Sequence, residues 1–358
     1  MEITRRHLPK ATVRAAFGVA LSAIAFGATA AAGQTSGHAM PTYHEVARYK
    51  VGGDGGWDYV TCDSTGHRLF IARGSHVQVV STRTGAVEGD IPGTKGCHGV
   101  ALAPALNRGF VSDGGSNSVT IFDLKTLKVL DTVAVGGRPD AILYDPATKR
   151  VFTFNAGSED ATALDAASGK VVGTVKLGFK PEFAQSNGKG RVFVNNEDGS
   201  ELVTFDPRAL TILTRTPLAP AEGPSGLAID PKTERLFSAC GNQKAAVIDG
   251  KTGKLLATPT IGEGPDAAAF DPGMRLAFTS NGEAGTLSVL KEMGNGTYTT
   301  TEVKTAVGAR TMALDPATHR IYLITAQAEP APASSGANGG RQWPRMVPGS
   351  FEVLVFAP

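Results

Sequence analysis

Apolar and polar residues alternate in four short runs between residues 137 and 178. The runs are AILYD, RVFTFN, ATALDA and VVGTVKLG, and they are rich in Val, Ile, Phe and Thr. Alternation with a period of two is typical of strands with one buried face, and the Asp-Pro, Asn-Ala-Gly and Ser-Gly sequences between the runs are typical of turns. This segment therefore predicts a sheet of four antiparallel strands.

The same pattern recurs about every 42 residues, a period that is typical of propeller blades. One position at the entry to the first strand of each repeat can be followed along the chain, and it is occupied by Asp58, His98, Asp140, Glu182, Ser225, Asp266 and Thr311. These seven positions predict an all-β fold, a seven-bladed β-propeller with four antiparallel strands in each blade.

The last repeat has only three strands of its own, TMALDP, RIYLITA and FEVLVFAP. A lone strand, YHEVARYKVG at 43–52, precedes the first repeat. We expect this N-terminal strand to complete the last blade and so to remove an open sheet edge that would invite aggregation. Residues 43–358 then form a single propeller domain.

Two connections are longer than the others. Residues 291–301 lengthen the hairpin between the third and fourth strands of the sixth repeat, and residues 326–350 separate the second and third strands of the seventh. The Pro, Ala, Gly and Ser of the second connection predict a solvated loop. Its residues Arg341, Trp343 and Arg345 instead favour a lid over the face that carries the registered positions, and both interpretations are open.

The N-terminus has the pattern of an export signal. Basic residues precede a weakly apolar stretch and a run of small residues, which predicts a signal peptide at 1–32 and a linker at 33–42. The segment TRRHLPK is compatible with twin-arginine export as well as with ordinary Sec export. We expect a periplasmic or secreted monomer, with no membrane span once the signal is removed.

Charge and cysteine content restrict the partners and cofactors. The formal net charge of +2 includes the basic leader, and the rest of the chain is close to neutral, so nucleic acid is not an expected partner. The three cysteines, Cys62, Cys97 and Cys240, show no metal-type spacing. No C-x-x-C-H or phosphate-binding glycine motif is present, so we expect neither covalent haem nor a nucleotide cofactor.

Three second-strand segments, VFTFNAG, VFVNNED and AFTSNGE, are followed by a further strand and then by D-x-x-x-G-K or a near equivalent. In this the chain resembles the YVTN-repeat, YncE-like extracytoplasmic β-propellers over about residues 43–358. The resemblance implies the propeller fold strongly and a function weakly, because this architecture carries ligand binders, redox proteins and hydrolases. It also brings single-stranded DNA binding into consideration.

The loops that enter the innermost strands meet at the mouth of a propeller's central channel. The first ring there would contain four carboxylates and an imidazole, from Asp58, His98, Asp140, Glu182 and Asp266. A second ring, at the ends of the second strands, would contain Arg73, Asp113, Asn155, Asn196, Cys240, Asn281 and Thr325. Gathered carboxylates repel one another, so we expect positive charge at this mouth.

Three sources of positive charge are open. Arg73 and Arg310 would neutralise the acids internally, or a cationic or polyol ligand would bind. Alternatively a divalent cation would bind: Asp140, Glu182, Asn155 and Asn196 suit calcium or magnesium. His98 with Asp58, and with Cys97 or Cys240, would favour zinc or copper. Trp57 would either stack on a ligand or fill the channel.

The function that these residues predict is binding of a small ligand or a divalent metal at the channel mouth, without catalysis. A metal-dependent hydrolase of the lactonase kind is the alternative, in which Asp266 or Asp140 would activate water beside the metal. A single-stranded DNA-binding or protein-interaction propeller is a third hypothesis, which a near-neutral chain with an acidic mouth disfavours.

Overall fold

The computed structural model describes residues 40–53, 55–294, 296–329 and 346–358. Met40–Pro358 form one compact unit. The predicted signal peptide and residues 33–39 of the linker lie outside the described residues. The same holds for Arg341, Trp343 and Arg345 of the predicted lid.

Five antiparallel sheets of four strands and one of seven account for the strands of the described residues. The first sheet contains β2 (Val60–Asp63), β3 (Arg68–Ala72), β4 (Gly74–Ser81), β5 (Val87–Ala103), β6 (Arg108–Asp113), β7 (Ser118–Asp123) and β8 (Val129–Ala134). The second sheet contains β9 (Pro139–Asp145), β10 (Arg150–Asn155), β11 (Asp160–Asp165) and β12 (Val171–Lys176). The third contains β13 (Pro181–Ser186), β14 (Val192–Asn196), β15 (Glu201–Asp206) and β16 (Thr211–Pro217), and the fourth contains β17 (Pro224–Ile229), β18 (Arg235–Cys240), β19 (Lys244–Asp249) and β20 (Leu255–Ala257). The fifth contains β21 (Pro265–Asp271), β22 (Leu276–Asn281), β23 (Thr286–Gly294) and β24 (Thr297–Lys304). The last contains β25 (Thr311–Asp315), β26 (Arg320–Thr325), β27 (Glu352–Ala357) and β1 (His44–Lys50).

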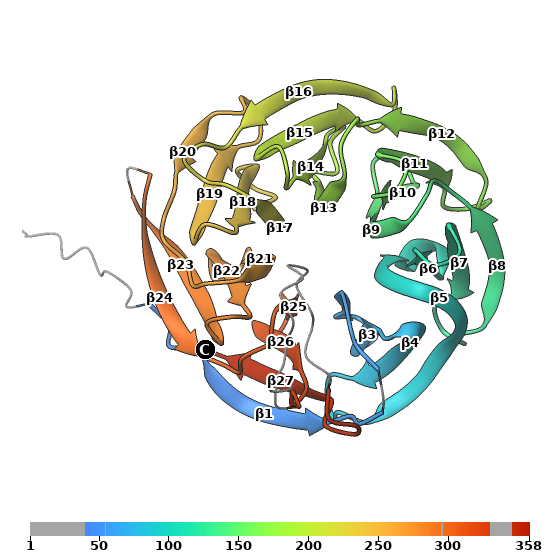
Figure 1. Ribbon diagram of the computed structural model, residues 1–358, viewed down its shortest axis with the longest axis horizontal. Helices are drawn as coiled ribbons and strands as arrows, with labels where there is room; N and C mark the ends of the chain where they lie inside the picture. The colour runs from blue at the N-terminus through green and yellow to red at the C-terminus, as the bar shows by residue number, and fades with distance from the viewer. Residues whose placement is uncertain (1–39, 54, 295, 330–345) are drawn as a thin grey trace, which may run out of the picture. The chain divides into compact units, whose positions relative to one another are not determined.

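The sheets of this unit stand around a common centre (Figure 1). The first strand of a sheet, such as β9, β13 or β17, lies nearest the centre, and the fourth, such as β12 or β16, lies at the rim. The only helical segment in the described ranges is the short 3-10 turn η1 (Pro104–Leu106). The predicted all-β, propeller-like architecture of antiparallel sheets is therefore confirmed.

The first two repeats share one sheet, which the repeat pattern did not predict. Strand β5 pairs with β4 through its first half and with β6 through residues 97–103, so that the ladder continues from one repeat into the next. Gly93 and Gly96 lie between these halves with positive φ angles of 83° and 57°, which let the backbone turn without a break in the strand. Among the described residues the strands therefore form six hydrogen-bonded sheets, one of which contains the first two repeats.

The N-terminal strand closes the last sheet. Strand β1 pairs antiparallel with β27, with His44 opposite Ala357 and Lys50 opposite Glu352. Since β1 is the fourth strand of a sheet that otherwise has three, the predicted completion of the last repeat by residues near 43–52 is confirmed.

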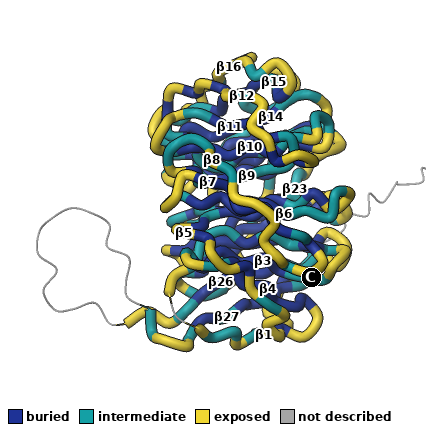
Figure 2. The backbone as a smooth tube through the Cα atoms, turned by 90° about the vertical axis from the view of Figure 1, so that its right-hand side faces the viewer, coloured by how far each residue is buried: buried dark blue, intermediate teal, exposed yellow. Residues whose placement is uncertain are grey.

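The hydrophobic core lies between neighbouring sheets. One cluster combines Phe152 and Phe154 of β10 with Val194 of β14 and Phe205 of β15, so it spans two consecutive sheets. Figure 2 shows the same division, with buried backbone inside the sheets and exposed backbone in the turns. Burial of such side chains contributes about 1.5–3 kcal/mol each, and neighbouring sheets are the surfaces that provide it.

An arginine at or just before the start of the second strand fastens several repeats to the next one. Its guanidinium group donates to backbone carbonyls in the turn between the third and fourth strands of the following repeat. The contacts are Arg68 to Leu124 at 2.8 Å, Arg108 to Ala166 at 3.3 Å, Arg150 to Pro207 at 2.7 Å and Arg208 at 3.1 Å, and Arg191 to Gly250 at 2.8 Å and Lys251 at 2.9 Å. We call this repeated contact the arginine clamp.

Replacing Arg150 by methionine should lower the free energy of unfolding by about 1–3 kcal/mol. The carbonyls of Pro207 and Arg208 would lose a charged donor, and hydrogen bonds to charged groups contribute about 1.5–3 kcal/mol. Denaturant unfolding checks this, with Lys170→Ala in an exposed turn as the control. Equal stability of the Arg150 variant and the wild type would show that the clamp does not hold the sheets together.

No helix in the described part of the chain is long and apolar enough to cross a bilayer.

Candidate functional site

Hydrogen bonds to the main chain hold three first-ring positions together, one just before β2, one within β5 and one near the start of β9. The N–H of Asp58 donates to the carbonyl of Ala72 at 3.0 Å, and the N–H of Tyr59 donates to the carbonyl of His98 at 3.2 Å. The Ser112 hydroxyl accepts from the N–H of Gly99 at 2.9 Å and donates to the carbonyl of Asp140 at 2.5 Å. Asp58, His98 and Asp140 are thus brought together by backbone contacts between consecutive repeats.

The side chains of Asp58, His98 and Asp140 form a compact group, which we call the mouth triad. His98 Nδ1 lies 2.6 Å from Asp58 Oδ2 and 3.9 Å from Asp140 Oδ1. One ligand-type atom from each of the three residues lies within 4.8 Å of the others. The triad contains the imidazole nitrogen and carboxylate oxygens that bind divalent transition metals.

The protonation of the mouth triad is shifted by its surroundings. The hydrogen bond to Asp58 raises the pKa of His98 and outweighs the opposing effect of burial. Burial raises the pKa of Asp140 to about 6, although the charge of His98 acts in the opposite direction. These shifts follow from carboxylates that are partly removed from water beside a basic ring.

Two cations occupy other parts of the first ring. Arg310 pairs with Asp266, and its Nη2 lies 3.9 Å from Asp58 Oδ1. Lys180 Nζ lies 2.9 Å from Glu182 Oε1 and 3.8 Å from Glu197 Oε2. Arg310 therefore neutralises the charge of Asp266, as expected, and Lys180 neutralises that of Glu182.

The amides of the second ring are engaged within their own sheets. Asn155 Nδ2 donates to Asp160 at 2.6 Å and to Thr162 at 2.9 Å. Asn196 Nδ2 donates to Glu201 at 2.9 Å. Asn281 Nδ2 likewise donates to Thr286 at 3.0 Å and to Ser288 at 2.7 Å. The amide oxygens, which a metal would use, are also engaged: Asn155 Oδ1 accepts from the Thr153 hydroxyl at 2.9 Å, and Asn196 Oδ1 accepts from the N–H of Gly199 at 3.0 Å. These local contacts do not support a shared oxygen-donor set with Asp140 and Glu182.

Arg73 and Trp57 pack on the same aromatic ring. The guanidinium carbon of Arg73 lies 3.6 Å from the ring centroid of Phe351, and its Nη1 donates to Gln78 Oε1 at 2.8 Å. The ring of Trp57 lies 5.7 Å from that of Phe351. Both side chains therefore support the segment that leads into β2.

Asp113 stands where three other repeats have asparagine, at positions 155, 196 and 281. Its Oδ2 accepts from the Thr120 hydroxyl at 2.6 Å, while its Oδ1 is buried with no partner among the described residues. Burial raises the pKa of Asp113 to about 6, despite the hydrogen bond from Thr120. Asp113 is the last residue of β6. The repeat register predicts it as a member of the second ring of the channel mouth.

The cysteines are not part of the mouth triad. All three are free thiols. The Sγ of Cys97 donates to the carbonyl of His76 at 3.2 Å, and that of Cys240 to the carbonyl of Ser238 at 3.5 Å. Burial raises the pKa of Cys240 to about 11, so a metal-binding thiolate is disfavoured there.

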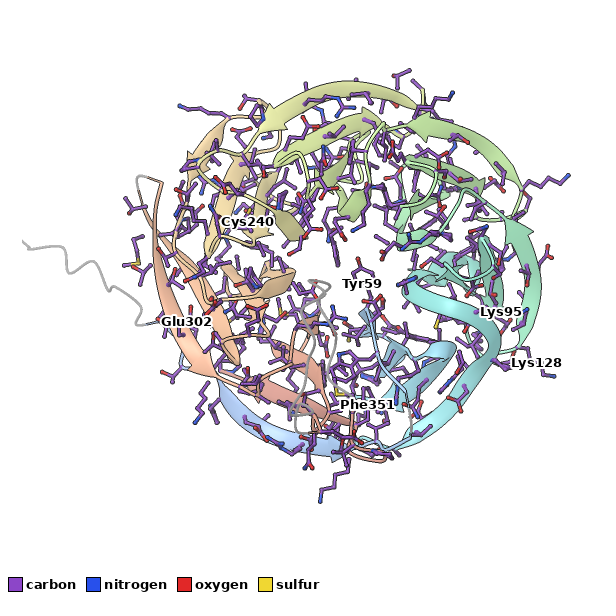
Figure 3. All side chains as sticks on the ribbon, in the orientation of Figure 1. Tyr59, Lys95, Lys128, Cys240, Glu302 and Phe351 are labelled. Carbon is purple, nitrogen blue, oxygen red and sulfur yellow. The ribbon has the colours of Figure 1, made fainter. Side chains whose placement is uncertain are left out.

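Tyr59 is a component of the mouth that the repeat pattern did not identify. Figure 3 shows it near the centre of the ring of sheets, and its ring contacts that of Phe183 edge-on with centroids 5.2 Å apart. Burial, and then the charges of Asp140 and Glu182, raise its pKa well above the usual range. Its place directly after Asp58, at the entry to an innermost strand, was the available signal.

These features define a class of protein: an all-β protein of repeated antiparallel sheets, built like a propeller. No family model and no curated protein match the chain. Among solved structures, it is similar to Kuenenia stuttgartiensis hydrazine synthase, with a TM-score of 0.67 and 15% identity over 75% of this chain and 92% of the other. It is also similar to U3-55K (TM-score 0.67, 11% identity, 87% and 98% covered) and to a chain of the mitotic checkpoint complex (TM-score 0.71, 12% identity, 95% and 99% covered). At these identities the similarity concerns the fold alone.

Proposed function

We propose that this chain is a seven-bladed propeller that binds a divalent cation through Asp58, His98 and Asp140 at the mouth of its central channel. The observation that carries the proposal is the proximity of their three ligand-type atoms, all within 4.8 Å of one another. In this proposal β5 supplies the fourth strand of the first blade and the first strand of the second. The cation would in turn hold a small-molecule ligand, without catalysis.

The donor set favours zinc over calcium. One imidazole nitrogen and two carboxylate oxygens suit zinc, which takes four ligands and accepts nitrogen. Calcium prefers six to eight oxygen ligands, and the amides of Asn155 and Asn196 are engaged within their sheets. His98 would have to bind through Nδ1, the atom that now contacts Asp58.

Zinc titration followed by calorimetry tests the proposal. We expect saturable binding with one site per chain, and affinity lower by about tenfold or more in His98→Ala. The matched control is His76→Ala, because His76 also faces a carboxylate, with Nε2 3.5 Å from Asp90 Oδ1. Among the described residues it belongs to no group of three possible metal ligands. Absence of saturable binding, or equal loss in the two variants, would overturn the proposal.

We also propose that the protein acts outside the cytoplasm as a monomer of the YncE-like type. The basic and then apolar pattern of residues 1–32 supports export. Fractionation of producing cells tests the location, and recovery of the unprocessed chain in the cytoplasm alone would contradict it.

A further inference from the structure

The turns that contain the arginine clamp gather on one face of the described unit. Strands alternate in direction within a repeat, so the turns after the first and third strands lie together at the end remote from the mouth. Hydrogen bonds join the two turns: the N–H of Leu124 donates to the carbonyl of Asn107 at 3.0 Å, and that of Ala166 to that of Lys149 at 3.0 Å. We call this surface the clamp face, and it consists of residues 64–67, 82–86, 104–107, 124–128, 146–149, 166–170, 187–190, 207–210, 231–234, 250–254, 272–275 and 316–319.

The exposed charged side chains of the clamp face are all cationic. No aspartate or glutamate within these ranges is exposed. The exposed cations come from the first six repeats, and they are Arg83, Lys125, Lys128, Lys149, Lys170, Lys189, Arg208, Lys232, Lys251, Lys254 and Arg275. Lys189 and Arg275 also contact the carboxylates of Glu234 and Asp230, so these two cations add little to the charge of the face.

The aspartates beside these turns are balanced from within the protein. The carboxylate of Asp165 accepts from the N–H of Ser168 at 2.7 Å. Hydrogen bonds from Ser168, and then the charge of the clamp residue Arg108, lower the pKa of Asp165. The clamp residue Arg68 likewise has its Nη2 2.9 Å from Asp63 Oδ2. Clamp arginines therefore offset buried and half-buried carboxylates, and the exposed lysines give the face an excess of positive charge.

The face that carries the mouth has the opposite charge balance. The exposed charged residues in its connections, at 92–97, 114–117, 135–138, 156–159, 177–180, 197–200, 218–223, 241–243, 258–264, 282–285 and 305–310, are mostly acidic. They are Glu159, Asp198, Glu222, Glu263 and Glu283, against Lys95 and Arg138. The near-neutral charge of the chain as a whole therefore conceals two faces of opposite sign.

Exposed apolar side chains border the clamp face. Residues 129–130 begin β8 and residues 171–172 begin β12, and these Val and Leu side chains are 42–52% exposed. Each pair directly follows an exposed lysine, Lys128 or Lys170, and Figure 3 shows Lys128 at the outer edge of the ring of sheets. Because a strand rises about 3.3 Å per residue, these apolar groups lie within about 7 Å of the clamp face. Lysines beside exposed apolar groups are typical of surfaces that bind at the interface of a bilayer.

We propose that the clamp face docks on an anionic lipid bilayer. The lysines would contact the lipid phosphate groups, and the apolar residues 129–130 and 171–172 would enter the headgroup region. Each cation near an anionic bilayer raises the affinity about fivefold, and cations from consecutive repeats of one face can reach the bilayer together.

A bilayer matches this face better than single-stranded nucleic acid does. Nucleic-acid surfaces provide aromatic rings for base stacking, whereas the exposed large hydrophobic side chains of the described residues are Val, Leu and Met. The clamp face shares no residue with the mouth triad and needs no metal, so this proposal stands or fails independently of the function proposed above. With the clamp face on the bilayer, the mouth would open towards the solution.

Co-sedimentation of the full chain with vesicles tests the proposal. We expect binding to vesicles of phosphatidylcholine mixed with phosphatidylglycerol at low salt, weaker binding at high salt, and little binding to phosphatidylcholine alone. The triple variant Lys128→Gln/Lys170→Gln/Lys254→Gln should bind the mixed vesicles about a hundredfold more weakly, from about fivefold for each lysine. Leu130→Ser should weaken binding by about fivefold, because one apolar side chain is lost from the contact.

The matched control is Lys95→Gln/Lys176→Gln/Lys304→Gln. It changes the net charge equally, at exposed positions near the mouth end of the strands, and should leave vesicle binding unchanged. Val307→Ser, at a 74% exposed residue of the mouth face, is the control for Leu130→Ser. The basic leader is present in every variant, so a difference between the two triple variants reports the clamp face.

Absence of salt-sensitive binding to the mixed vesicles would overturn the proposal, and so would equal loss of binding in the two triple variants. Binding of a single-stranded oligonucleotide by a chain that does not bind the vesicles would also overturn it, because the face would then serve a different partner.

Discussion

Phe152→Ala should lower the free energy of unfolding by about 3–5 kcal/mol, the range typical of truncating a buried phenylalanine. The Phe152 side chain is fully buried. Its ring lies edge-on to that of Phe205 at 62°, with centroids 5.4 Å apart, so the contact joins β10 to β15 of the next sheet. The cavity left by alanine would be shared by two sheets that pack against each other, and neither could close it alone.

Denaturant unfolding measures this effect through the midpoint, provided that the slope of the transition stays unchanged. Val172→Ala in β12 is the matched control, because Val172 is 43% exposed and its truncation should change stability by less than about 0.5 kcal/mol. A loss below about 1 kcal/mol in Phe152→Ala would mean that the junction between these sheets contributes little to stability.

The strands were predictable from the sequence because apolar, β-branched and aromatic runs are separated by turn residues. AILYD and RVFTFN appear as the paired strands β9 and β10. The single buried face expected from their alternation was wrong for β10, because residues 151–155 are buried throughout and Val151 and Phe152 pack in different core clusters. The closing pair of β1 and β27 was predictable for a related reason, since a three-stranded last repeat leaves an edge without a partner. The continuity of β5 was not predictable, because it depends on the φ angles of Gly93 and Gly96. The pattern of apolar positions carries no information about these angles.

The candidate site was only partly predictable. The repeat register placed Asp58, His98 and Asp140 at one level, and the structure brings their side chains together. The repeat register also placed Asn155 and Asn196 near the channel. A register gives the position of a residue along its strand, but it does not give the hydrogen-bond partners of the side chain. An acidic residue five positions later, Asp160 or Glu201, was the signal that these amides have partners within their sheets.

Asp113→Asn should stabilise the protein by about 3 kcal/mol at pH 7 and above. Burial raises the pKa of Asp113 from its ordinary value of 3.8 to about 6, and this residue is 1% exposed. The amide would restore the asparagine found at positions 155, 196 and 281, with Thr120 in the place that Thr162 has beside Asn155. The replacement removes a buried charge and supplies a donor to an existing partner.

The pH dependence of this effect has a definite sign. Below about pH 4 the carboxyl group is protonated in both folded and unfolded chains, so its ionisation costs nothing there. Between about pH 4 and pH 6 the unfolded chain ionises first, and the wild type loses stability as the pH rises. The advantage of Asp113→Asn should therefore grow through this interval and stay constant above it.

Unfolding free energies of the wild type and Asp113→Asn, measured from pH 4 to pH 8, test this expectation. The reciprocal variant Asn155→Asp is the control: its stability should fall as the pH rises from the pKa of an unfolded aspartate to the higher pKa of the buried carboxyl group. A constant difference between Asp113→Asn and the wild type across this range would mean that Asp113 does not titrate within it. The negative charge of Asp113 would then be balanced by a positive charge in the folded protein. His98 is the group expected to supply it, because its charge already lowers the pKa of Asp113.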